Sequence, residues 1–459
     1  MTELARQPSM IQKYTSEILL ADLTPKRRLS YFFLGLALAL TLGTAQFVVP
    51  VKINIFYDVV GAHWDPFAKS MIVVVLIPVL IIYNLLVSAL PGPISLVWVM
   101  SILYAVVYAY LWTAFLVDTP SKWAAWLLYY ATETKGVLIM PMLWSVVAEV
   151  STSTLSKKSY PFIFAIIQAG GMAGSSVAIQ VKKLGGPIIL LLVQAVLFVI
   201  VAAIAHAGVA VLGGEKAEVL LDKKEEKETV QENACLKASK FLFEGVEGLI
   251  LLLSRPFAFG IFWVSYATLV PRTVLDYETS LFVYGQYHEN NDRVAFWGKL
   301  SLVQNLCILA VTLLGTRQVV NALGVGGSLL LLPVVLLGCI TALCISYEFW
   351  TSVFAGVIAS IVAFGLNSPC KEMLFTRTSR DIKYKAKSWS EMWGNNFMKL
   401  LGSQINLWFN KAESSQCVEC FKKLPTGGIT AGWVAIWIGI VIYVKQTFNR
   451  LEEEDKVIE

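Results

Sequence analysis

Charged residues are scarce in this sequence. Only 15% of its 459 residues are Asp, Glu, Lys or Arg, whereas soluble globular proteins carry roughly 25%. Hydrophobic residues make up 56% of the chain. A buried core alone does not explain the deficit, because the surface of a soluble protein has to stay polar. The composition excludes an ordinary soluble domain and predicts an all-α polytopic membrane protein.

Residues that build catalytic and metal sites are also few. The three histidines are scattered, and the glycine-rich "GVGGS" at Gly324 precedes no P-loop lysine. Among seven cysteines, only Cys417 and Cys420 have redox or metal spacing, and no second pair or nearby histidine completes a zinc site. We interpret them as packing or incidental loop residues, which could form a disulfide if the loop faces an oxidising space. We expect no enzymatic activity, no cofactor, no metal and no nucleic-acid partner.

Long apolar runs dominate the chain, and many reach the ~20 residues that a helix needs to cross a bilayer. The expected spans of the first half are 29–50, 67–90, 93–117, 122–149, 160–181 and 187–213. Those of the second half are 255–275, 293–315, 319–341, 349–368, 387–409 and 426–446. Twelve transmembrane helices in two six-helix bundles are typical of major-facilitator-like carriers.

The most polar segment separates the two halves. The predicted organisation is a cytoplasmic N-terminal segment (1–28), a first bundle (29–214), a cytoplasmic linker with an amphipathic helix (215–254), a second bundle (255–446) and a cytoplasmic tail (447–459). Lys and Arg in short loops gather on one side of this arrangement, which places both termini in the cytoplasm. The first 25 residues resemble neither a signal peptide nor a transit peptide. This favours a bacterial inner membrane.

Ionisable residues inside the expected spans are the first candidates for a site, because a charge at mid-bilayer costs at least ~2.5 kcal/mol. Glu133 and Lys135 lie in the fourth span. Their i,i+2 spacing puts them on different faces, so they do not neutralise each other. Lys52 lies at the far end of the first span, where it either enters a site or reaches the membrane interface.

Two further candidates come from the late part of the chain. The stretch "NSPCKEMLFTRTSRDIKYKAKSW" begins with Lys371 and Glu372 at the end of an apolar run and continues as a basic cytoplasmic loop. In the eleventh span, polar residues recur at three- or four-residue spacing and share one face. They are Glu391, Asn395, Lys399, Gly402 and Asn406. A polar stripe on a spanning helix faces protein or water, and we favour a substrate cavity.

Several segments together resemble the nucleotide transporter family, the ATP/ADP translocases of plastids and obligate intracellular bacteria. They are "SPCKEMLF", "DIKYKAKSW", "GNNFMKLLGSQI", "TETKGV", "YPFIFAIIQAGG" and "VPVKINIFYD". The resemblance places the charged substrate residues of that family at Lys52, Glu133 and Lys371. This sequence differs from the family at two places. Around Lys52 the arginine and the first aspartate of the family's motif are missing, and Val274 lies near the position where the family has a glutamate.

The resemblance implies a secondary active carrier for nucleotides, working by ATP/ADP-type exchange or by proton-coupled uptake. Its substrate is either ATP/ADP or another nucleotide. We expect the substrate to be bound by Lys52, Glu133, Lys371, Lys135, Arg272, Asn395 and Lys399. Glu133 and Glu372 would balance charge or carry a coupling proton. Tyr129 or Trp393 could stack on a base, but we favour lipid-facing or packing roles for both. We expect a monomer in the lipid bilayer. The alternatives are a carrier of another solute or phosphorylated metabolite and, from a different class, a non-transporting membrane scaffold.

Overall fold

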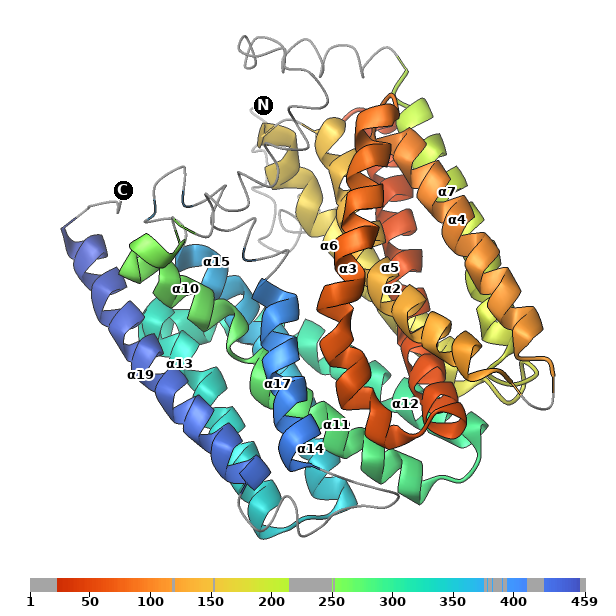
Figure 1. Ribbon diagram of the computed structural model, residues 1–459. Helices are drawn as coiled ribbons and strands as arrows, with labels where there is room; N and C mark the ends of the chain where they lie inside the picture. The colour runs from red at the N-terminus through yellow and green to blue at the C-terminus, as the bar shows by residue number, and fades with distance from the viewer. Residues whose placement is uncertain are drawn as a thin grey trace, which may run out of the picture.

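The computed structural model describes residues 23–117, 120–151, 153–213, 250, 252–374, 378, 382, 390, 394–410 and 425–454. The elements within these ranges are helices (Figure 1). The first half contains α2 (Pro25–Val59), the short turn η1 (Ala62–Trp64), α3 (Asp65–Ala89), α4 (Pro93–Ala114), α5 (Lys122–Glu149), α6 (Ser153–Ile179) and α7 (Ile189–Ala210). We call these helices the N-bundle.

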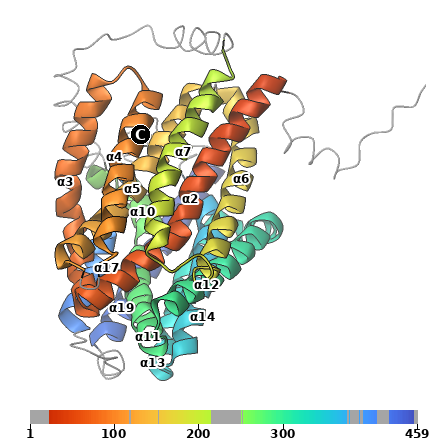
Figure 2. The same cartoon turned by 90° about the vertical axis from the view of Figure 1, so that its right-hand side faces the viewer.

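The second half forms the C-bundle. It contains α10 (Pro256–Tyr266), α11 (Leu269–Gln286), α12 (Asn290–Ala310), η2 (Val311–Gly315), α13 (Thr316–Ile345), α14 (Phe349–Val362), η3 (Ala363–Asn367), α15 (Ser368–Leu374), α17 (Asn395–Phe409) and α19 (Pro425–Glu453). Each bundle has its own apolar core. The two bundles meet where α12 packs on α2 and α6 and where α17 packs on α3 (Figures 1 and 2).

Nine helical segments within the described ranges are long and apolar enough to cross a membrane. The other predicted spans correspond to α5, α12 and α17, which are more polar. Of these, α5 carries Glu133 and Lys135, and α17 carries Lys399. All three pack against several other helices, as polar spanning helices must when their backbone and side chains avoid lipid.

Close contact between α2 and α6 depends on glycine. A Cβ atom on Gly174 would lie 1.9 Å from the carbonyl oxygen of Gly43, and one on Gly170 would lie 2.3 Å from that of Ala39. The helix backbones therefore touch directly, as small residues spaced four apart allow in membranes.

We expect Gly174→Ala to lower the thermal unfolding temperature of the protein in detergent. The added methyl group collides with backbone that cannot rotate away, and overpacking of this kind costs about 1–3 kcal/mol. Gly439→Ala is the matched control, because a Cβ at Gly439 meets nothing within 4 Å. Alanine there gains about 1 kcal/mol of helix propensity instead. Equal unfolding temperatures for the two variants would contradict close packing at Gly174.

The predicted seventh span, 255–275, is wrong at its end. The helix pair α10 and α11 continues to Gln286, with a two-residue turn at Ala267 and Thr268. The polar run "DYETS" suggested a loop, but Glu278 and Thr279 are buried between helices, with 0% and 3% of their surface exposed. Polar side chains that face other helices look like loop residues in the sequence. The extra length of α11 brings more polar groups into the C-bundle.

Candidate functional site

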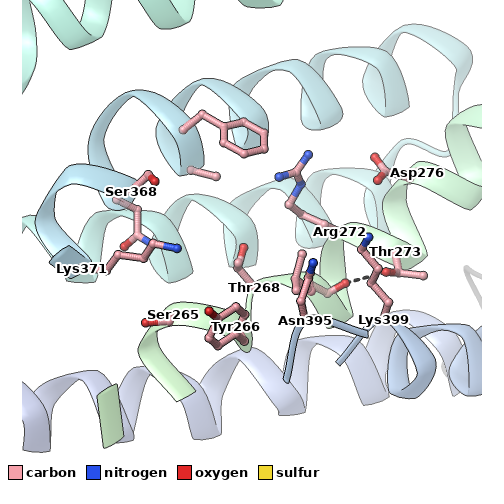
Figure 3. A pocket seen from close by; sticks show the side chains of 14 residues that line it. Ser265, Tyr266, Thr268, Arg272, Thr273, Asp276, Ser368, Lys371, Asn395 and Lys399 are labelled. Atoms are coloured by element: carbon pink, nitrogen blue, oxygen red, sulfur yellow. Dashed lines mark hydrogen bonds between the residues drawn. The ribbon is translucent and has the colours of Figure 1, made fainter. Parts of the chain in front are cut away.

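A cavity of about 480 Å³ lies within the C-bundle (Figure 3). Its wall is formed by the end of α10, by α11, by the segment from η3 into α15, and by the start of α17. The lining residues are Ser265, Tyr266, Thr268, Leu269, Arg272, Thr273, Asp276, Ala363, Phe364, Asn367, Ser368, Lys371, Asn395 and Lys399. Four predicted substrate-binding residues thus share one cavity: Arg272, Lys371, Asn395 and Lys399.

Helical periodicity explains how α11 contributes to this wall. Leu269, Arg272, Thr273 and Asp276 follow one another at spacings of three, one and three residues, so they lie on one face. The same rule brings Asn395 and Lys399 of α17 together at i,i+4. The sequence pointed to Arg272 alone on α11. Counting three and four residues onward from it would have found Asp276, which the sequence-based interpretation left in a loop.

Three cationic side chains and one carboxyl group line the cavity. Arg272, Lys371 and Lys399 come from three different elements, and Asp276 is the acidic residue of the lining (Figure 3). Arg272 donates to Ser360 Oγ at 3.3 Å and lies 4.9 Å from the centre of the Phe364 ring. Within the described residues, neither Arg272 nor Lys399 forms an ion pair with a carboxylate. The cavity is therefore positively charged.

Several polar atoms of the lining have no hydrogen-bond partner among the described residues. They belong to side chains that are at most 8% exposed: Ser265 Oγ, Thr268 Oγ1 and Asn367 Oδ1. Leaving a buried polar group unsatisfied costs about 1–3 kcal/mol. Hydroxyl groups, an amide oxygen and excess positive charge around one cavity suit a polar anionic ligand. The volume also lies within the usual range of ~300–1,000 Å³ for small-molecule sites.

The charged pair in the N-bundle is not among the residues of this lining. Lys52 is 1% exposed, and its Nζ atom lies 2.5 Å from Glu133 Oε1. Lys52 Nζ also lies 4.2 Å from the centre of the Tyr129 ring. The alternative that Lys52 reaches the membrane interface is therefore wrong. Glu133, 24% exposed, is the more accessible partner.

Tyr129 is not available to stack on a base in this structure. It is fully buried, and its hydroxyl group donates to Asp65 Oδ1 at 2.7 Å. Asp65 in turn pairs with Lys69 at 3.1 Å. The favoured interpretation of Tyr129 as a packing residue is confirmed, because the ring is buried and its hydroxyl group belongs to a polar network. Tyr266 lines the cavity instead. The centre of its ring lies 5.5 Å from Lys371 Nζ.

Lys135 also lies outside the cavity lining. It is 4% exposed, and its Nζ atom donates to Gln194 Oε1 at 2.8 Å, in the N-bundle between α5 and α7. The prediction that Glu133 and Lys135 do not pair with each other is confirmed. Their i,i+2 spacing turns Glu133 toward Lys52 and Lys135 toward Gln194. The position of Lys135 favours a structural contact over contact with substrate.

Removing Glu133 is expected to destabilise the protein, because Lys52 would remain buried without its partner. Breaking a buried pair in this way costs about 3–5 kcal/mol, whereas replacing both partners by apolar residues is often neutral. We therefore expect Glu133→Gln to lower the unfolding temperature in detergent and the double variant Lys52→Met/Glu133→Leu to recover most of the loss. If the double variant were no more stable than the single one, the ion pair would not be the cause.

A second charged contact joins the two bundles where α2 ends and α12 begins. Arg293, which is 5% exposed, lies 2.8 Å from Asp58 Oδ1, and Asn290 donates to Asp58 Oδ2 at 2.6 Å. The guanidinium group also donates to Tyr287 O at 2.7 Å and covers the Tyr284 ring at 3.9 Å. We call the Asp58–Arg293 pair with Asn290 the bundle latch. Sequence reasoning missed it.

Neutral contacts across the bundles lie near the same end. The hydroxyl group of Tyr277 donates to Ala62 O at 3.3 Å, and Gln404 donates to Ser70 Oγ at 2.9 Å. Ala62 and Ser70 follow the end of α2, whereas α2 begins at the opposite end of the molecule (Figure 1). The bundles are therefore fastened at the end remote from the start of α2.

Some predicted residues lie outside the described residues. These are Glu391, Trp393, Cys417 and Cys420, most of the linker 215–254, and the side chain of Glu372, whose backbone belongs to α15. The polar stripe of α17 is divided. Asn395 and Lys399 line the cavity, whereas Gly402 and Asn406 pack against α11. No group of three or more potential metal ligands is found in the described part of the chain.

No family model and no curated protein match this sequence. Solved structures of transporters do match the fold. The crystal structure of nucleoside transporter NupG is 12% identical with a TM-score of 0.56, over 92% of this chain and 99% of that chain. A bacterial homolog of the human lysosomal transporter Spinster, in an inward-facing and unoccupied conformation, is 12% identical with a TM-score of 0.54, over 93% and 98%.

A POT family transporter in complex with 5-aminolevulinic acid is 9% identical with a TM-score of 0.55, over 91% of this chain and 96% of that chain. At such identities the likeness shows the fold. The predicted fold class is confirmed: the chain is an all-α polytopic membrane protein with the two-bundle fold of major facilitators. Membership of the nucleotide transporter family stays a prediction.

Proposed function

We propose that this protein is a secondary active carrier of nucleotides or closely related phosphorylated anions. The proposal rests on the C-bundle cavity. Its lining includes three cationic residues, Arg272, Lys371 and Lys399, and one acidic residue, Asp276. A terminal phosphate group carries about −1.5 to −2 charges at neutral pH. Three cations from three elements match such a group. An uncharged ligand would bring no counter-charge to Arg272 and Lys399, which form no ion pair among the described residues.

The residues of the cavity suit different parts of a nucleotide. The guanidinium group of Arg272 can hold phosphate oxygens bidentately, whereas Lys371 and Lys399 act as point charges. Ser265 Oγ and Thr268 Oγ1, which lack partners among the described residues, can bond ribose hydroxyl groups. Tyr266 offers an aromatic face for a base, and base–aromatic stacking contributes ~1–3 kcal/mol.

Transport by alternating access needs two bundles that separate at one end at a time. The bundle latch, Tyr277 and Gln404 hold the bundles together at the end remote from the start of α2. If both termini are cytoplasmic, as the loop charges predict, the fastened end is external. The structure would then be the inward-facing state of the cycle. Lys52 and Glu133 would balance each other's charge in this state.

Two other functions compete with this proposal. NupG is a nucleoside transporter, and a nucleoside or another solute could use the same fold, since fold does not fix substrate. The excess of cations in the cavity favours phosphates over such neutral solutes. A membrane scaffold without transport activity is the candidate from a different class. The unpartnered polar atoms of Ser265, Thr268 and Asn367 in one cavity favour a ligand.

Uptake into proteoliposomes tests the proposal. The panel comprises labelled ATP, ADP, GTP, NAD, a sugar phosphate and adenosine, each with and without an excess of unlabelled competitor. We expect saturable uptake of at least one nucleotide that other nucleotides inhibit and adenosine does not. Uptake of adenosine that nucleotides leave unchanged would replace the proposal with a nucleoside carrier. If no compound were bound or taken up, the scaffold would be supported.

A further inference from the structure

A carboxyl group with no assigned role lies on α11 outside the cavity. Glu278 is 0% exposed. Its Oε2 atom accepts a hydrogen bond from the Tyr347 hydroxyl group at 2.5 Å, and its Oε1 atom accepts one from Asn410 Nδ2. No described lysine or arginine forms an ion pair with it. Both carboxyl oxygens are therefore held by neutral groups inside a membrane helix bundle.

The elements around Glu278 bring little charge. On α11 its neighbours are Tyr277 and, on the cavity face, Asp276. Tyr347 and the exposed Glu348 precede α14, which itself has no titratable residue. The nearest charge on α17 within the described residues is Lys399, eleven positions before Asn410, and α19 has no titratable residue before Tyr443. Asp65 of the N-bundle is already paired with Lys69.

The hydrogen-bond partners of Glu278 can satisfy it with or without a proton. The side-chain oxygen of Asn410, Oδ1, is buried and has no partner among the described residues. Rotating this amide by half a turn would present that oxygen to a protonated carboxyl group as an acceptor. A tyrosine hydroxyl group can likewise donate or accept. The site therefore accommodates both states of one carboxyl group without a compensating cation from the described part of the chain.

The position of Glu278 connects this site to transport. Asp276 lines the cavity, the next residue, Tyr277, donates to Ala62 of the other bundle, and Glu278 follows. Three successive positions of one helix thus face the substrate cavity, the bundle interface and the carboxyl site. Glu278 contacts Asn410 after α17 and Tyr347 before α14. We therefore expect a change in its charge to act, through α11, on both of the other contacts.

We propose that Glu278, with Tyr347 and Asn410, is the proton-binding site that couples a proton gradient to transport. The inference rests on the proposed function. In the step, a proton from the more acidic side forms an O–H bond with one carboxylate oxygen of Glu278, and it leaves on the other side after the bundles have moved. No other bond is made or broken. Burial of a carboxylate without a cation is costly, which favours proton uptake before the bundles close over it.

Two readouts test Glu278→Gln, with Glu348→Gln as the exposed-carboxyl control. In proteoliposomes with a more acidic outside, wild type and control should accumulate labelled ATP in proportion to the pH gradient. Glu278→Gln should lose this dependence while still exchanging internal for external nucleotide. In infrared difference spectra of the purified protein against pH, the band of a protonated carboxyl group should be absent from Glu278→Gln and present in the control.

The possible outcomes separate failure of the Glu278 proposal from failure of the proposed transport function. Accumulation by Glu278→Gln that still follows the gradient, or wild-type uptake indifferent to it, overturns the inference and leaves the carrier intact. If Glu278→Gln does not fold, Tyr347→Phe removes one donor to the ionised carboxyl group and should shift the pH profile of uptake to higher pH; an unchanged profile overturns the proposal. If wild type takes up no nucleotide, the proposed function fails, and the infrared titration still tests Glu278.

Discussion

Arg272→Gln is expected to reduce nucleotide uptake by ~30-fold to ~1,000-fold, measured as the initial rate in proteoliposomes at low nucleotide concentration. Loss of one partner of a buried charge contact costs about 2–4 kcal/mol, and every 1.4 kcal/mol is about tenfold in affinity. Arg272 lies on the cavity face of α11, and its guanidinium group forms no ion pair with a described carboxylate. Its charge is therefore available to a phosphate.

Glutamine keeps much of the length and hydrogen-bonding capacity of Arg272 and removes the charge. The control is Arg255→Gln, which removes the same charge from an exposed position just before α10, outside the cavity lining. The control should transport at the wild-type rate. Equal losses in both variants would indicate a general effect of net charge, and undiminished uptake by Arg272→Gln would remove Arg272 from the substrate site.

Breaking the bundle latch is expected to produce the second largest effect. In Asp58→Ala, the buried Arg293 loses its carboxylate in the fastened state, at a cost of about 3–5 kcal/mol. Each 1.4 kcal/mol corresponds to about tenfold in an equilibrium constant. The ratio of molecules open at this end to molecules fastened at this end should therefore rise by ~100-fold or more. Uptake should slow, since one end state of the cycle becomes scarce.

Accessibility of a cysteine introduced at Ser70 measures this shift, because Ser70 is 1% exposed and contacts Gln404 across the bundles. In a background without reactive native cysteines, a membrane-impermeant maleimide should label it faster in Asp58→Ala than in the parent. The exchanged pair Asp58→Arg/Arg293→Asp should restore slow labelling. Unchanged labelling in Asp58→Ala would show that the latch does not hold the bundles together.

Hydropathy was sufficient to predict the helices that face lipid, because lipid demands a long apolar surface. It was also informative about Glu133 and Lys135, since charges stand out in an apolar run and their spacing separates them. Hydropathy could not identify the residue that pairs with Glu133. Lys52 lies 81 residues earlier, and no local pattern indicates that these two side chains meet.

The outer part of α11 and the latch were not predicted, for a related reason. Glu278 and Asp276 belong to a polar run that has the composition of a loop, and only the packing of α17 and α14 around α11 shows that it is a buried helix. Asp58 and Arg293 are 235 residues apart, at the ends of helices. Contacts between bundles depend on how two separate domains approach, and this has no signature within either half of the sequence.

The central claim is that the C-bundle cavity binds the phosphate groups of a transported nucleotide. A structure of the full-length protein determined with bound ATP tests it most directly. We predict phosphate oxygens in contact with Arg272, Lys371 and Lys399, and the base or ribose near Tyr266 and Thr268. Nucleotide bound elsewhere in the molecule, with this cavity empty while the same preparation transports ATP, would contradict the account.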